Sequence, residues 1–181
     1  MTIKEIAVTT AKLLGLTDVA RAMEDGGEAH VEESEKLVCA VNRTIRSVAV
    51  KYLPPETEQT FDGREAVDFT EFLQIPISIR AVTGADGKSK KYAVRGQTLF
   101  IPREKVVVRY RFLPPFASVE DECCYTESLL PREVISAGAA AEYCISEGRY
   151  EDADFWADYF RQGILSATKK PRRIKVRRDW L

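Results

Sequence analysis

The residue types that carry most enzymatic chemistry are sparse in this sequence. It holds one histidine, His30, and four cysteines that form no CxxC pair: Cys39, Cys123, Cys124 and Cys144. A serine or cysteine nucleophile activated by an imidazole would have to use His30, which follows a Gly-Gly turn in a polar stretch. We expect His30 to be an exposed loop residue and the thiols to be unpaired, as in a reducing compartment. The same counts predict no zinc site.

Carboxylates near the C-terminal end are the best candidates for binding a cation. The cluster consists of Glu147, Glu151, Asp152, Asp154 and Asp158. The middle three would occupy the first turn of a helix, where negative charge is favourable, so capping explains the cluster better than a divalent ion does. The phosphate-binding patterns GxxxxGK[ST] and GxGxxG do not occur in the sequence. We therefore predict no cofactor, no metal and no catalytic residues: the protein is expected not to be an enzyme.

The composition is that of an ordinary folded protein. The chain has 181 residues, of which 45% are hydrophobic and 30% charged, and a chain of this size buries roughly 70% of the surface that its unfolded form exposes. No apolar run approaches the ~20 residues that a membrane-spanning helix needs, so we expect no membrane partner. We predict one α+β domain at residues 1–168, with a β insertion at about 56–113 between helices, followed by a basic C-terminal arm at 169–181.

Helices are predicted on both sides of the insertion. Thr2 and Glu5 have the spacing of a capping box at the start of a first helix. A short helical piece follows at about 18–23, and a long helix at about 32–52 ends before Pro54.

A helical hairpin is predicted at the end of the domain. Its first helix begins near Pro131, stops at Gly148 and contains the small-residue run SAGAAAEY, which lets another helix approach closely. Its second helix, at about 151–167, is expected to bury a stripe formed by Trp156, Tyr159 or Phe160, Ile164 and Ala167.

Between the helices, apolar and polar residues alternate, which predicts an antiparallel sheet of four to six strands. The run KVVVRYRF, for example, places Val106, Val108 and Tyr110 on one face. Tight turns are predicted at about 85–88 and 95–97. Because binding residues concentrate on loops of a rigid scaffold, we interpret these turns as docking tips, with ordinary solvated turns as the alternative. Their residues are Asp86, Lys88, Lys90, Arg95 and Gln97.

Positive charge is concentrated at the C-terminal end. The chain holds 27 basic and 28 acidic residues, and residues 169–181 (KKPRRIKVRRDWL) supply seven of the basic and one of the acidic ones, a net +6 that leaves −7 for the rest. We interpret this segment as an arm that binds an acidic neighbouring protein. Nonspecific binding of nucleic-acid phosphates and mere solubility remain alternatives, although a terminal Trp-Leu adds nothing to solubility. The candidate arm residues are Arg172, Arg173, Lys175, Arg177, Arg178 and Trp180.

The order of elements resembles that of the head-tail connector proteins of tailed bacteriophages and prophages, also called adaptor or head-completion proteins. The resemblance spans about residues 3–167. It is carried by a long helix ending in KYLPP, a strand-rich region closing with KVVVRYRFLPP, and the hairpin LLPREVISAGAAAEYCISEGRYEDADFWADYFRQGILSA. It is a likeness of architecture, so no functional residue is transferred from the family, and the basic arm lies beyond it.

The resemblance implies a structural role in virion assembly without catalysis. Connector proteins of this kind form a ring of about twelve copies below the portal, and DNA passes through the ring. The implied partners are other copies of the chain, the portal protein, tail or stopper proteins, and DNA contacted without sequence specificity. The implied location is the bacterial host cytoplasm during assembly and then the virion neck. The alternative is a small nucleic-acid-binding or regulatory protein that uses the basic arm.

Overall fold

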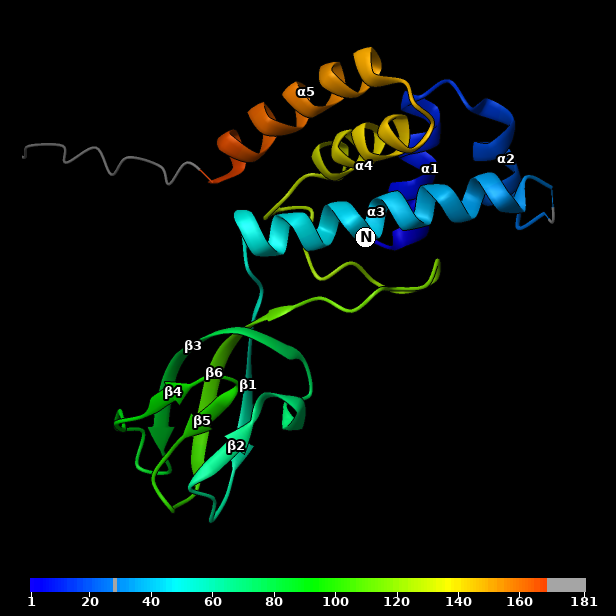
Figure 1. Cartoon of the computed structure of the whole chain (residues 1–181). Helices are drawn as coiled ribbons and strands as arrows, with labels where there is room; N and C mark the ends of the chain where they lie inside the picture. The colour runs from blue at the N-terminus through cyan, green and yellow to red at the C-terminus, as the bar shows by residue number, and fades with distance from the viewer. Residues whose placement is uncertain (28, 169–181) are drawn as a thin grey trace, which may run out of the picture.

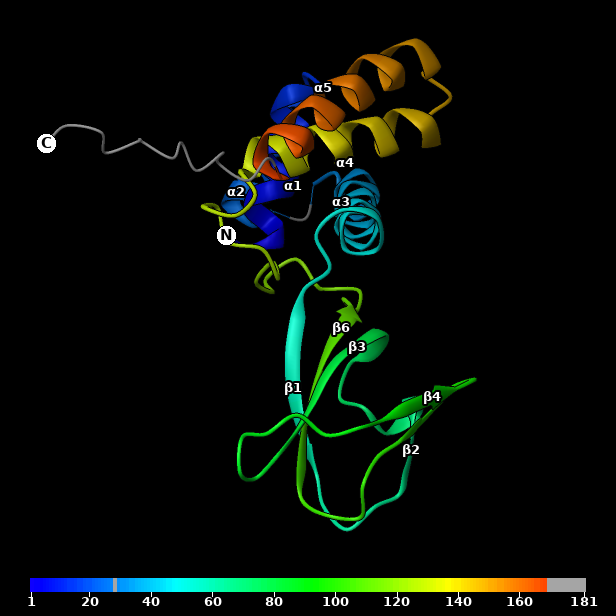
Figure 2. The same ribbon diagram turned by 90° about the vertical axis from the view of Figure 1, so that its left-hand side faces the viewer.

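The computed structural model describes residues 1–27 and 29–168. Within them, helices flank strands as the sequence predicts, and the α+β fold class is confirmed. The helices are α1 (Ile3–Leu13), α2 (Thr17–Asp25), α3 (Val31–Lys51), α4 (Arg132–Ser146) and α5 (Tyr150–Thr168). The strands are β1 (Glu56–Phe61), β2 (Ala66–Asp68), β3 (Ile75–Gly84), β4 (Ala93–Arg95), β5 (Thr98–Phe100) and β6 (Val106–Leu113). The helices gather in one bundle, and the strands form a second body beside it (Figures 1 and 2).

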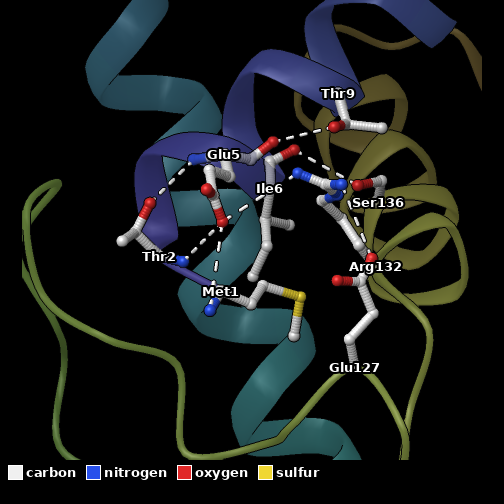
Figure 3. Close-up of polar contacts among 8 residues, drawn as sticks. All are labelled: Met1, Thr2, Glu5, Ile6, Thr9, Glu127, Arg132 and Ser136. Atoms are coloured by element: carbon white, nitrogen blue, oxygen red, sulfur yellow. Dashed lines mark hydrogen bonds and ion pairs between the residues drawn. The ribbon is translucent and has the colours of Figure 1, made fainter.

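The N-terminus of α1 is capped as its sequence predicts. The Thr2 hydroxyl accepts a hydrogen bond from the Glu5 backbone N–H at 3.2 Å, and the Glu5 carboxylate accepts one from the Thr2 N–H at 3.0 Å. The same carboxylate lies 3.9 Å from the Arg132 guanidinium at the start of α4. One turn later, the Ser136 hydroxyl donates to the Ile6 carbonyl at 3.2 Å. The cap and these contacts together fix α1 against α4 (Figure 3).

The small residues of α4 admit close neighbours, which the sequence also predicts. A Cβ atom added at Gly138 would lie 2.6 Å from Cγ2 of Thr44 on α3 and 2.9 Å from Cδ2 of Phe160 on α5. A Cβ added at Gly163 of α5 would lie 2.7 Å from a methyl group of Val134 on α4. Because carbon atoms cannot approach so closely, these two glycines set the spacing of α4 with α3 and α5.

The strands lie in two three-stranded antiparallel sheets rather than in the single sheet expected. One sheet has the order β1-β6-β3 and the other β2-β5-β4. Each sheet turns its apolar face toward a core that the two sheets share, so the apolar face of neither sheet is left in water. The members of this core include Val67, Val82, Leu99, Val106, Val108 and Tyr110. The helices have a separate hydrophobic core.

An ion network joins the first turns of α3 to the C-terminal end of α4. The Tyr143 hydroxyl donates to the Glu33 carboxylate at 2.6 Å, and the Lys36 ammonium lies 3.3 Å from Glu33 and 3.2 Å from Glu147. The hydrogen bond from Tyr143 is the largest reason that the pKa of Glu33 lies below its usual value. Burial is the largest reason that the pKa of Tyr143 lies above its own.

We expect Tyr143→Phe to lower the free energy of unfolding by about 1 kcal/mol at neutral pH, because a half-exposed carboxylate loses a hydrogen bond. The folded-state pKa of Glu33 is lowered, so its contribution is complete above the unfolded-state pKa and is lost as the pH falls through the folded-state value. Urea denaturation of both proteins from about pH 7 to about pH 3 should show the difference in stability shrinking with acidity. A difference that stays constant over this range contradicts the assignment.

Candidate interaction surfaces

The predicted arm cannot be placed. Its residues Arg172, Arg173, Lys175, Arg177, Arg178 and Trp180 lie outside the described residues.

The first predicted turn is described by the structure. The first turn follows β3: the Lys88 backbone N–H donates to the Asp86 carboxylate at 3.1 Å, and the half-buried Lys90 places its ammonium 2.9 Å from Glu104. Asp86 and Lys88 are exposed. Lys90 therefore joins the turn to the connection between β5 and β6. Asp86 lies 3.9 Å from the Lys90 ammonium and helps to hold the turn, so Lys88 is the better candidate for docking.

The second predicted turn is the tip of the β4–β5 hairpin. Arg95 pairs with Thr98, so Gly96 and Gln97 form a two-residue turn. Gly96 has a φ of 59°, which suits glycine at the first central position of a tight hairpin turn. Arg95 and Gln97 are exposed. This turn belongs to the β2-β5-β4 sheet and the first to the β1-β6-β3 sheet, so the two tips are separate sites.

The second helix of the hairpin buries less of its apolar stripe than the sequence predicts. The stripe was expected to contain Trp156, Tyr159 or Phe160, Ile164 and Ala167. Ile164 is fully buried, and Phe160 and Ala167 are half-buried and pack against the helical core, whereas Trp156 is only half-buried and Tyr159 is 52% exposed. The cause is that α5 packs mainly on α4, so the sides of α5 that face away from α4 have little to cover them. The sequence does contain an indication of this exposure. Aromatic residues at 155, 156, 159 and 160 of a helix point in more directions than one partner helix can cover.

Two exposed aromatic residues of α5, Phe155 and Tyr159, lie on either side of the half-buried Trp156. The ring centroids of Phe155 and Trp156 are 5.0 Å apart, and those of Trp156 and Tyr159 are 6.4 Å apart. Phe155 is 64% exposed. We call Phe155, Trp156 and Tyr159 the α5 aromatic face. A cluster of large apolar side chains in water is a surface suited to contact another protein.

A second surface, the apolar groove, lies in the bundle. This cavity of about 520 Å³ is bounded by the C-terminal end of α2, the N-terminal half of α3 and the segment 116–120 after β6. Lys4, Glu35 and Glu120 also line it. The apolar part of the lining includes Ala22, Met23, Val31, Val38, Cys39 and Val119. Because the walls are about 80 residues apart in the chain, no local sequence pattern predicts the groove.

Asn42 and Arg46 of α3 hold the segment that forms one wall of the groove. The Asn42 side chain is 3% exposed, donates to the Ala117 carbonyl at 2.9 Å and accepts from the Ala117 N–H at 2.8 Å. Arg46 donates to the Pro114 carbonyl at 2.7 Å and stacks over the Phe116 ring at 4.9 Å. These contacts tie the chain to α3 directly after it leaves β6.

Charge differs between the bundle and the strands. Residues 1–55 and 114–168 hold 10 basic and 19 acidic residues, a net −9, whereas residues 56–113 hold 10 basic and 8 acidic residues, a net +2. The bundle is therefore the part of the chain that complements the +6 arm electrostatically.

His30, the cysteines and the acidic cluster of residues 147–158 are distributed over several elements. His30 is exposed directly before α3, and the four cysteines are unpaired. Glu151 and Asp152 lie in the first turn of α5, where we expected acidic capping, whereas Asp154 was expected there but lies beyond it, because the helix already begins at Tyr150. Within residues 1–27 and 29–168, no three histidine, cysteine or carboxylate side chains are placed to hold a metal ion.

The helices of that same part of the chain are all too short or too polar to cross a membrane. A scan against protein-family models finds no match for this chain, and a search of curated proteins finds no match either.

Proposed function

We propose that this protein is a structural virion assembly protein, a head-tail connector whose copies form a ring below the portal. The observation that carries the proposal is the α5 aromatic face, because a folded domain that leaves Phe155 and Tyr159 largely in water has a surface for another protein to cover. The order of elements, which resembles that of phage connector proteins, supplies the kind of assembly. Burial of this face between copies would favour a closed ring.

The other features of the chain are consistent with this role. The acidic bundle offers few of the cation–phosphate contacts that would hold DNA as it passes through a ring. The two exposed turn tips extend from a rigid pair of sheets and are available to the portal, tail or stopper proteins. In this proposal the protein assembles in the bacterial host cytoplasm and ends in the virion neck.

The composition of the arm supports a second candidate function, nucleic-acid binding or regulation. Seven basic residues in thirteen would contact phosphates with little regard for sequence. This function requires DNA affinity that falls steeply with salt and is lost when the chain ends at Thr168. Fluorescence anisotropy with a labelled duplex at several salt concentrations measures both. Tight binding without self-association would favour this alternative over the connector.

We expect the double substitution Phe155→Ser and Tyr159→Ser to weaken self-association at least about tenfold, because each buried aromatic side chain contributes roughly 1.5–3 kcal/mol. Native mass spectrometry across a concentration series, with electron microscopy of the large species, measures the change. Leu73→Ser is the matched control, since Leu73 is 80% exposed but lies among the strands. Unchanged assembly of the double variant contradicts a role for α5, and a wild-type protein that stays monomeric contradicts spontaneous ring formation.

A further inference from the structure

The proposed function assigns no role to the apolar groove, and the position and chemistry of this groove identify an occupant. We propose that the groove of one copy receives the C-terminal end of the neighbouring copy, with Trp180 and Leu181 as the anchoring side chains. This inference rests on the proposed function, because it names a second contact between neighbouring copies, beside the α5 aromatic face.

The chemistry of the two surfaces is complementary. The groove has the size of pockets that take a compact organic group, which generally fall between about 300 and 1,000 Å³, and its lining is mainly apolar. The arm contains the apolar residues Ile174 and Val176 and the adjacent apolar pair Trp180-Leu181, which is the larger apolar group. Tryptophan is one of the residues that most often supply the binding energy of an interface when they fill a pocket.

The charges on the two surfaces also match. The arm carries a net +6, and the bundle that contains the groove carries a net −9. Glu35 and Glu120 line the groove itself and are exposed, and Lys4, whose ammonium lies 4.0 Å from Glu120, lines it as well, which leaves the lining with a net −1. An arm that enters the groove therefore brings its cations past carboxylates, whereas the strand region, with a net +2, offers no such attraction.

The direction of α5 indicates that the arm enters the groove of a neighbouring copy rather than the groove of its own chain. The turn before α5 lies beside the N-terminal part of α3, where Glu147 meets Lys36 at 3.2 Å. Further along, Phe160 contacts Tyr52 at the C-terminal end of α3, with ring centroids 6.2 Å apart. The helix thus runs away from the groove and ends at the opposite end of the bundle (Figure 1).

The length of the arm is sufficient for contact between copies. Thirteen residues span at most about 45 Å when extended, and α5 itself, with 19 residues, is about 28 Å long. To reach its own groove, the arm would have to turn back along the whole bundle. Copies placed head to tail bring the arm of one directly to the groove of the next. Such a heterologous contact generates a ring when the rotation between copies closes.

A thiol that already lines the groove allows a direct test. Cys39 is half-buried in the groove, whereas Cys124 is more exposed and lies beside Tyr52 and Leu53, away from the groove. The full-length Asp179→Cys variant keeps Trp180 and Leu181. It is mixed with an isotopically labelled copy of itself and oxidised mildly, and the linked peptides are identified by mass spectrometry. We expect disulfides between position 179 of one chain and Cys39 of another, although random collision would favour Cys124.

Two further variants of the Asp179→Cys protein provide controls. Trp180→Ala removes the anchor, and Ser34→Trp fills the groove from α3; each should abolish most of the cross-link to Cys39. Val50→Trp places the same bulky residue at an exposed position of the same helix, outside the groove, and should leave the cross-link unchanged. Thermal melting confirms that each variant is folded.

The outcomes separate this inference from the proposed function. Rings without cross-links to Cys39, or cross-links mainly to Cys123 and Cys124, overturn the groove contact and leave the connector proposal standing. Cross-links only within one chain overturn the contact between copies. Cross-links to Cys39 between chains that form pairs or open filaments, but no closed ring, support the groove contact and contradict the ring.

Discussion

Asn42→Ala is expected to lower the free energy of unfolding by about 3 kcal/mol, because it leaves two backbone groups without partners. The Asn42 amide donates to the carbonyls of Val38 and Ala117 and accepts from the Ala117 N–H. The site is buried, so water cannot readily replace the lost hydrogen bonds. For a chain of this length the loss corresponds to a fall in Tm of roughly 6–12 °C.

The same substitution tests whether Asn42 forms the groove wall. Arg46→Ala is the matched control: it removes a contact with the same segment one turn later on α3, but from a half-exposed side chain, and should cost about 1 kcal/mol. Urea denaturation gives both values. In the Asn42→Ala protein, hydrogen exchange of residues 114–120 should also accelerate. Equal losses for the two variants would show that burial of Asn42 does not set the strength of this contact.

Gly138→Leu is expected to destabilise the bundle by about 3 kcal/mol, because the position has no room for a side chain. Even a Cβ atom would collide with Thr44 and Phe160. α5 must then move outward, which displaces the α5 aromatic face, so self-association should weaken along with stability. Thermal denaturation and native mass spectrometry of the same sample measure the two effects.

A compensating substitution checks the cause of this effect. Phe160→Ala removes the ring that the new side chain meets, so the double variant Gly138→Leu, Phe160→Ala should lose less stability than the two single losses combined, because the two sites share one space. Strictly additive losses would mean that the crowding at Gly138 is relieved by another route. Gly138→Ala should fall between the wild type and Gly138→Leu.

Features with short-range causes could be read from the sequence. The capping box of Thr2 and Glu5 depends on residues three apart, and the buried face of β6 depends on strict alternation along one strand. The small residues around Gly138 predicted close helix packing, because a missing side chain permits it whatever the partner is. The charge of the arm, and the hypothesis that it binds an acidic neighbour, follow from composition alone.

Only the tertiary structure decided which apolar side chains remain uncovered. α5 buries Ile164 and packs Phe160 and Ala167 on the core but leaves Tyr159 in water, because burial depends on the number of neighbouring elements and α5 has one main partner. The strands divide into two sheets because their apolar faces cover each other. The apolar groove exists because Asn42 holds a residue 75 positions away. The sequence by itself determined the elements and their charges, which have local causes, whereas the candidate assembly surfaces arise from contacts between distant segments.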